Sequence, residues 1–256
     1  MAIQIFWDRV KQRIRREASL RFGKRPVSLA ISRPIVSFTF DDFPLSALQV
    51  GGAILEDHGF AGTFYTSLGL AGMQGPVGRY FSEADLSGLL ERGHELGCHT
   101  YDHCDAWLTP ARDYEASILR NRQELQRVLP GAAFASHSYP ISYPRPSAKA
   151  VVGHHFCCAR GGEPGANGRK SDANSLHAIF IEKAGGDLAV TKRYIDHAVA
   201  AGSWLILATH DVSETPSPFG CGPQVFSELV RFIAAAGITV MPVSRVFASL
   251  RNDRTS

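Results

Sequence analysis

Ionisable side chains follow directly after apolar runs at three places in the 256-residue chain. Asp41 and Asp42 follow the first run. His99 closes the run over residues 94–99, with His103 four residues later, and His210 closes the run over 203–210. Burial of ionisable groups must be compensated by polar partners or by a metal ion. These residues are therefore the first candidates for a catalytic site.

The four-residue spacing of His99 and His103 places both imidazoles on one face of a helical turn, within reach of one cation. With ten histidines in the chain, the pair alone fits a satisfied histidine and a surface histidine equally well. Two adjacent carboxylates at a buried strand end repel each other unless one binds a cation and the other holds or accepts a proton. One aspartate with two histidines leaves coordination positions open, which is typical of catalytic zinc. The pattern thus predicts a metal site with a carboxylate base beside it.

Short apolar runs alternate with helical patterns after Pro34. The runs cover residues 35–40, 61–66, 94–99, 132–138, 154–159, 176–181, 203–210 and 238–243. The helical patterns cover 45–58, 82–92, 111–129, 188–201 and 223–236. This alternation predicts an α/β fold with parallel strands, as a barrel or as a doubly wound open sheet. Such folds keep their sites at the carboxyl ends of the strands, where the candidate residues lie.

Three motifs in this order resemble those of the polysaccharide deacetylase family, the NodB-homology group of carbohydrate esterase family 4. They are Thr39-Phe40-Asp41-Asp42, Gly93-His94-Glu95-Leu96-Gly97-Cys98-His99-Thr100-Tyr101-Asp102-His103, and His210-Asp211. The similarity runs from about Ile35 to about Ser244. It implies an α/β fold with a distorted (β/α) barrel of seven or eight parallel strands.

The resemblance also implies a reaction and a role for each motif residue. The expected reaction removes an N-acetyl group from an amino sugar in an oligosaccharide, a polysaccharide or a lipid-linked saccharide. Asp42, His99 and His103 would bind a divalent metal, with Zn²⁺ expected first and Co²⁺, Ni²⁺ or Mn²⁺ as alternatives. Asp41 would be the general base, and His210 would be the general acid that protonates the leaving amine.

A further motif of the family, which lies in sequence between the second and the His210-Asp211 motif and is its third, departs from its usual pattern in this chain. Its nearest equivalent is residues 138–142, in which Ser138 replaces the usual arginine. In this motif Tyr139 would supply a backbone N–H to the oxyanion, and Pro140 would contact the substrate. Arg160, at the end of the fifth apolar run, is expected to orient the base in place of the missing arginine; a loop salt bridge is its alternative role.

The acyl pocket and the exact substrate are less well defined by the motifs. Ala208 stands where the family often has a leucine, with Leu207 beside it, and both are expected to contact the substrate. Asp172 is a loose substitute for the fourth-motif aspartate, and His137 is a further candidate for substrate contact. Hydrolysis of another C–N amide, such as a cyclic ureide or imide, is the alternative function. A carbohydrate-binding protein without activity is a third.

Residues 1–25 carry eight basic and two acidic residues, so this segment has a charge of +6 and the remainder has −3. Apolar residues recur there at helical spacing: Ile3, Phe6, Trp7, Val10 and Ile14. The segment is expected to form an amphipathic helix that either packs this stripe on the body or lies on anionic lipid. No basic patch with interleaved aromatic residues occurs elsewhere, so a nucleic-acid partner is not expected.

The chain is expected to consist of a basic arm over residues 1–30 and a catalytic domain over 31–250. No apolar run approaches the roughly 20 residues that span a bilayer, and the start lacks the pattern of a secretory signal. A cytoplasmic location, including the inner face of a membrane, is therefore expected. The five cysteines cannot all pair, and reduced thiols fit this location.

Overall fold

The computed structural model describes residues 2–141, 143–182 and 188–252. Its central sheet has eight strands, which run in the order β10-β11-β2-β3-β6-β7-β8, with β12 also paired to β2. The strands are β2 (Ile35–Phe40), β3 (Thr63–Thr66), β6 (Glu95–Cys98), β7 (Ser136–Ser138), β8 (Cys158–Arg160), β10 (Ile179–Phe180), β11 (Trp204–Thr209) and β12 (Thr239–Val240). All of their pairings are parallel. The predicted α/β class is confirmed.

The sheet curls so that its two edges approach each other. Arg160 in β8 forms a parallel bridge with Leu176, which lies just before β10. The Leu176 amide donates to the Ala159 carbonyl at 2.7 Å, and the Gly161 amide donates to the Leu176 carbonyl at 2.8 Å. These bonds join the β8 edge to the segment that enters β10, which makes the sheet the distorted barrel that the resemblance implies.

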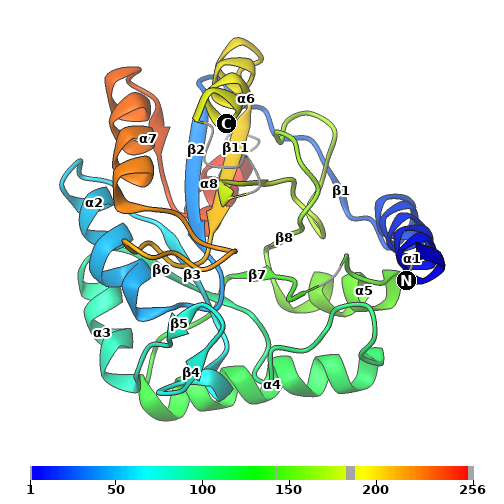
Figure 1. The fold of residues 1–256 in the computed structure, drawn as a ribbon. Helices are drawn as coiled ribbons and strands as arrows, with labels where there is room; N and C mark the ends of the chain where they lie inside the picture. The colour runs from blue at the N-terminus through cyan, green and yellow to red at the C-terminus, as the bar shows by residue number, and fades with distance from the viewer. Residues whose placement is uncertain (1, 142, 183–187, 253–256) are drawn as a thin grey trace.

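Helices cover the outside of the curled sheet and one of its ends (Figure 1). They are α1 (Ala2–Arg21), a π-helical turn (Ala47–Gly52) followed by α2 (Ala53–Glu56), a 3₁₀ turn (Leu68–Leu70), α3 (Glu83–Glu91), α4 (Ala111–Val128), α5 (Pro146–His155), α6 (Leu188–Ala200), α7 (Pro223–Ala235) and α8 (Val243–Asn252). Two antiparallel ribbons pair β1 (Pro26–Val27) with β9 (Ser171–Asp172) and β4 (Gln74–Gly75) with β5 (Gly78–Arg79).

Two of these helices were not expected from the sequence. The predicted strand over 154–159 begins within the last turn of α5, a helix whose buried face combines Ala148 and Val152 with the charged Lys149. Residues 243–252 do have apolar residues at helical spacing, and α8 packs them against the inner face of the sheet.

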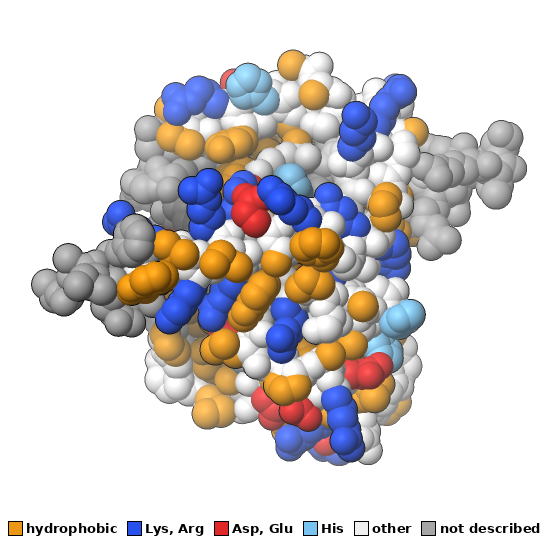
Figure 2. Space-filling model, turned by 90° about the vertical axis from the view of Figure 1, so that its right-hand side faces the viewer, with side chains coloured by type: hydrophobic (Ala, Val, Ile, Leu, Met, Phe, Trp, Pro, Cys, Tyr) orange, Lys and Arg blue, Asp and Glu red, His pale blue; other side chains and the backbone are white. Residues whose placement is uncertain are grey.

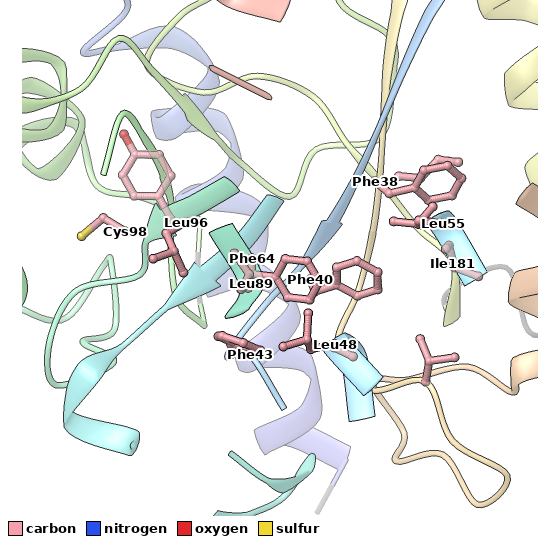
Figure 3. Close-up of a cluster of buried hydrophobic side chains, with 14 of the residues drawn as sticks. Phe38, Phe40, Phe43, Leu48, Leu55, Phe64, Leu89, Leu96, Cys98 and Ile181 are labelled. Carbon is pink, nitrogen blue, oxygen red and sulfur yellow. The ribbon is translucent and has the colours of Figure 1, made fainter. Parts of the chain in front are cut away.

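Side chains of β2 alternate between two hydrophobic clusters. Phe38 and Phe40 belong to the larger cluster, under the outer helices, where the Phe38 ring lies 5.4 Å from that of Phe226 in α7 (Figure 3). Ile35 belongs to the cluster inside the barrel, with Trp204 of β11. Because side chains alternate along a strand, the Asp41 side chain, just beyond the end of β2, points to the same inner face as Ile35.

Helix α1 is fastened to the body by polar contacts near its C-terminal end. The buried Lys149 ammonium donates to the carbonyls of Ser19 and Phe22 at 2.7 and 3.1 Å and pairs with Asp172 at 2.6 Å. The expected amphipathic helix is present, and Trp7 and Ile14 of its stripe are largely exposed. No helix within the described ranges is long and apolar enough to cross a bilayer. The division at residue 30 stays a prediction.

We expect Lys149→Ala to lower the free energy of unfolding by about 3–5 kcal/mol, because it leaves a buried partner charge uncompensated. Urea denaturation measures this change. Lys192→Ala is the control, since the partly exposed pair of Lys192 with Glu228 is worth about 1 kcal/mol or less. Equal losses in the two variants would show that Lys149 does not fasten α1.

Candidate active site

The site begins at the turn that follows β2. Phe40 and Phe43 are fully buried on either side of the two aspartates. The Phe40 ring stacks on the Phe64 ring at 4.6 Å between centroids, and the Phe43 ring stacks on the Phe81 ring at 4.7 Å. Figure 3 shows Phe40, Phe43 and Phe64. Packing of both phenylalanines in the outer cluster fixes the backbone between them, so the aspartates point away from that cluster.

Asp42, His99 and His103 come together as a group whose ligand atoms all lie within 4.8 Å of one another. The Asp42 Oδ1 atom lies 3.3 Å from His99 Nε2 and 2.9 Å from His103 Nε2. Two ligands that bind one Zn²⁺ at about 2.0–2.1 Å in tetrahedral geometry lie roughly 3.3 Å apart. Asp42 Oδ1 is buried and has no hydrogen-bond partner among the described residues. The group therefore fits a divalent cation.

The orientation of His99 is fixed from behind. Its Nδ1 hydrogen donates to the Ser138 carbonyl at 2.8 Å, which leaves the lone pair of Nε2 directed toward Asp42. Such a second hydrogen bond selects the tautomer and orients the ring of a metal-binding histidine.

The segment from His99 to His103 is a turn, so the expected helical turn was wrong. Thr100 and His103 have positive φ angles of 60° and 51°, and the Thr100 hydroxyl accepts the Cys104 amide at 2.9 Å. This turn brings the two imidazole rings to 5.2 Å between centroids.

The charges in the cluster favour a cation opposite Asp42. Burial raises the pKa of the Asp42 carboxyl, but the facing imidazoles of His103 and His99 outweigh it and hold the pKa below its ordinary value. Burial lowers the pKa of His103, and the Asp42 carboxylate outweighs that effect and raises it. A positive charge is thus stabilised here, whether an imidazolium or a metal ion carries it.

Asp41 is held by Arg160, the residue expected to replace the missing arginine. The Arg160 Nη2 group contacts both carboxylate oxygens of Asp41 and the Ser138 hydroxyl, and that hydroxyl lies 3.3 Å from Asp41 Oδ1. Ser138 and Arg160 are register partners in β7 and β8. The small serine therefore leaves room for the arginine of the neighbouring strand.

The balance of charges keeps Asp41 ionised although it is buried. Burial raises the pKa of this carboxyl, while the charges of Arg160, His99 and His210 lower it, and the net shift is downward. Asp41 is therefore a carboxylate near neutral pH, as a proton acceptor must be.

His210 follows β11, the strand that pairs with β2, so it lies beside the Asp41 turn, and its charge acts on the Asp41 carboxyl. Its Nδ1 hydrogen donates to the Phe219 carbonyl at 3.1 Å, and its ring lies 6.3 Å from the ring of Phe180. Asp211 shapes the following loop by accepting the Ser217 amide at 2.8 Å. Phe219 was missed from the sequence, because only the folding of this loop brings it back to His210.

Tyr139, whose backbone N–H was expected to serve the oxyanion, lies against the end of β8. Its backbone amide donates to the Arg160 carbonyl at 3.3 Å as part of the β7–β8 ladder, so this N–H is not directed at a substrate. The Tyr139 hydroxyl donates to the Asn174 carbonyl at 2.8 Å, and the side chain is buried. Pro140 is also buried, so it presents no side-chain surface to a substrate.

Other residues expected at the substrate lie in the core. Leu207 and Ala208 are fully buried, Leu207 in the outer cluster and Ala208 inside the barrel. His137 is buried, and its Nε2 atom lies 2.9 Å from the Tyr114 hydroxyl. Leu207, Ala208 and His137 thus contact other core residues, and their contact with a substrate stays a prediction.

Backbone strain is concentrated around this site. Among the described residues, those with positive φ other than glycine are Asp42, Phe43, Thr100, His103 and Ile141. All five lie in the turns that follow β2, β6 and β7. Non-glycine residues in this conformation cost free energy and occur where the surrounding packing imposes them, often at functional sites.

Comparison with known proteins agrees with this geometry. Residues 30–153 match the family model described as Polysaccharide deacetylase, which confirms the resemblance over that segment. It contains Asp41, Asp42, His99 and His103, whereas Arg160 and His210 lie beyond it. No curated protein sequence matches the chain.

Solved structures with the same fold include several enzymes of this group. The peptidoglycan deacetylase PdaC from Bacillus subtilis, as its D285S mutant, has a TM-score of 0.57 and 15% identity, over 88% of this chain and 94% of that one. A family 4 acetyl xylan esterase from Clostridium thermocellum, in complex with a cobalt ion, has a TM-score of 0.54 and 19% identity, over 84% and 90%. A mutant CE4 family pseudoenzyme with restored activity has a TM-score of 0.58 and 11% identity, over 84% and 68%. At these identities the likeness shows the fold.

We expect His99→Ala to weaken binding of Zn²⁺ or Co²⁺ by roughly 100-fold or more, since it removes one of three protein ligands. Isothermal titration calorimetry of the metal-free protein measures the affinity. His154→Ala, in the last turn of α5, is the matched control and should bind like the wild type. Equal affinity in both variants would exclude His99 as a ligand.

Proposed function

On the premise that residues 30–153 match the polysaccharide deacetylase family, we propose that this chain is a metal-dependent hydrolase that removes an N-acetyl group from an amino sugar. The observation that carries the proposal is the pairing of two adjacent buried aspartates with different partners. Asp42 faces two imidazoles, whereas Asp41 faces an arginine. One carboxylate is thereby suited to bind a cation and the other to accept a proton.

Asp41 would act as the general base toward the attacking water. Arg160 and the Ser138 hydroxyl hold its carboxylate in one orientation, and neither can take up the proton that Asp41 must accept. Asp42, His99 and His103 would hold the divalent cation, which when bound supplies Lewis-acid polarisation of the amide carbonyl.

His210 would donate the proton to the leaving amine. Because its Nδ1 hydrogen is given to the Phe219 carbonyl, Nε2 is the atom that would carry the transferable proton. The ring is held between Phe180 and Phe219, which limits its rotation. Asp41 and His210 follow two neighbouring strands, β2 and β11, so the base and the acid would both reach a substrate at this end of the barrel.

A cavity of about 580 Å³, whose lining includes Asp211 next to His210 in the sequence, would accept the saccharide. It lies between the loop after β2, the β4–β5 ribbon and the loop that starts at Asp211. Hydrogen-bonding side chains line it, including Gln49, Gln74, Arg79 and Thr215. Such a lining suits a ligand that is rich in hydroxyl groups.

We expect Asp41→Asn to lower kcat on N-acetylated amino sugars by about 10²–10⁴-fold, the usual contribution of a general base, while Zn²⁺ affinity stays within a few-fold of wild type. Acetate release from N-acetylglucosamine oligomers by the metal-loaded protein measures the rate. A panel that includes allantoin-type rings separates the cyclic-amide alternative. Binding of metal with no turnover of any N-acetylated saccharide would refute the proposal.

Arg160→Lys should move the acidic limb of the kcat/KM profile to higher pH. Arg160 lowers the pKa of Asp41, and a lysine cannot reproduce the contacts of the guanidinium fork. A raised Asp41 pKa protonates the base at a higher pH, so activity is lost earlier as the pH falls. An unchanged limb with only a lower kcat would mean that Arg160 acts through structure alone.

A further inference from the structure

Large hydrophobic side chains are exposed along α1 and just after it. Trp7 is 54%, Ile14 59% and Phe22 60% exposed. Trp7 and Ile14 are seven residues apart, two helical turns, and so lie on the same face. Figure 2 shows hydrophobic side chains gathered over this part of the surface with Lys and Arg side chains among them.

The inner face of α1 is already used. Arg16 forms a salt bridge with Glu163, with Nε at 2.8 Å from a carboxylate oxygen, and Ser19 is buried. The Lys149 ammonium caps the end of the helix through backbone carbonyls. The exposed apolar face therefore cannot turn inward without breaking these contacts.

The positive charge around this apolar face favours an anionic partner. Residues 1–25 carry a net charge of +6, and Arg9, Arg13 and Arg21 are exposed on the helix. Beside its C-terminal end, Lys24, Arg169 and Lys170 line a cavity of about 450 Å³. Exposed apolar residues among many basic ones are typical of helices that lie in the headgroup region of an anionic bilayer.

We propose that α1 seats the protein on an anionic lipid surface. Ile14, Trp7 and Phe22 enter the boundary between headgroups and acyl chains, and the basic side chains contact the lipid phosphates. A single exposed residue needs no explanation, but two on one basic helix and a third just after it form the kind of patch that marks an interaction site.

The helix also contacts loops at the rim of the active site. The Arg15 guanidinium lies 5.8 Å from the Trp107 ring, and the Ala106 amide donates to the Pro140 carbonyl at 3.4 Å. Next to these residues, Leu108 and Ile141 are 65% and 69% exposed. Ser138, whose carbonyl orients the ligand His99, is three residues before Ile141.

This arrangement brings the active-site opening near the lipid surface. If the proposed deacetylation holds, on which this step rests, the N-acetylated saccharide is one that a lipid anchor holds at the membrane. Leu108 and Ile141 would then contact the lipid-proximal part of that substrate or the bilayer itself.

Flotation of the full chain with vesicles tests the docking surface. Wild type should float with vesicles that contain phosphatidylglycerol and not with phosphatidylcholine alone. The double variants Ile14→Asp/Phe22→Asp and Arg9→Glu/Arg13→Glu should each lose roughly tenfold or more in binding. Leu119→Asp on α4 and Arg231→Glu on α7 alter exposed residues of the same types and should float like wild type. Circular dichroism checks that every variant is folded.

Failure of wild type to float with anionic vesicles would overturn the proposal, as would equal binding to both kinds of vesicle. Retained binding in the α1 variants would overturn it as well. A dimer in light scattering that Ile14→Asp/Phe22→Asp dissociates, with no vesicle binding, would instead assign the face to a second copy.

Flotation requires no catalysis, so its result does not depend on whether the deacetylation is correct. Faster turnover of a lipid-linked than of a soluble N-acetylated saccharide, lost in the same variants, tests the substrate step.

Discussion

The arrangement of this molecule depends on the burial of two adjacent carboxylates. Asp41 and Asp42 are both almost completely buried, and neither can stay ionised there without a positive partner. The fold supplies one to each from opposite directions. Arg160 reaches Asp41 from β8, and the histidine pair reaches Asp42 from the turn after β6. A difference in partners, rather than in residue type, separates a proton acceptor from a metal ligand.

The aromatic core keeps these partners apart. Phe40 and Phe43 anchor both ends of the aspartate turn in the outer cluster, although Asp42 and Phe43 then have φ angles of 62° and 50°. Each such residue costs about 1–3 kcal/mol, and the free energy of burying the two rings offsets that cost. If the turn relaxed, Asp42 would leave the imidazoles. The hydrophobic core therefore contributes directly to the geometry of the polar site.

Features that follow from the local sequence pattern were predictable. Features that depend on strand register, or on a loop that brings distant residues together, were not. Each of the eight apolar runs overlaps a strand, because burial on both faces leaves a clear signal. The motif spacing indicated that Asp42, His99 and His103 belong together. In contrast, the Tyr139 amide is used by the β7–β8 ladder, and Leu207 faces the outer helices. Both depend on which strand is the neighbour and which face is inside, and spacing along the chain does not contain that information.

Strand register explains why Arg160, rather than residue 138, holds Asp41. Ser138 and Arg160 lie side by side on β7 and β8, so a charge on either strand could reach Asp41. Arg160 also stands at the start of the loop that carries Glu163, and Glu163 binds Arg16 of α1. A displacement of α1 would therefore act on the loop that begins at the partner of the base. Arg160, which holds Asp41, and Glu163, which holds α1, are thus three positions apart in one chain segment.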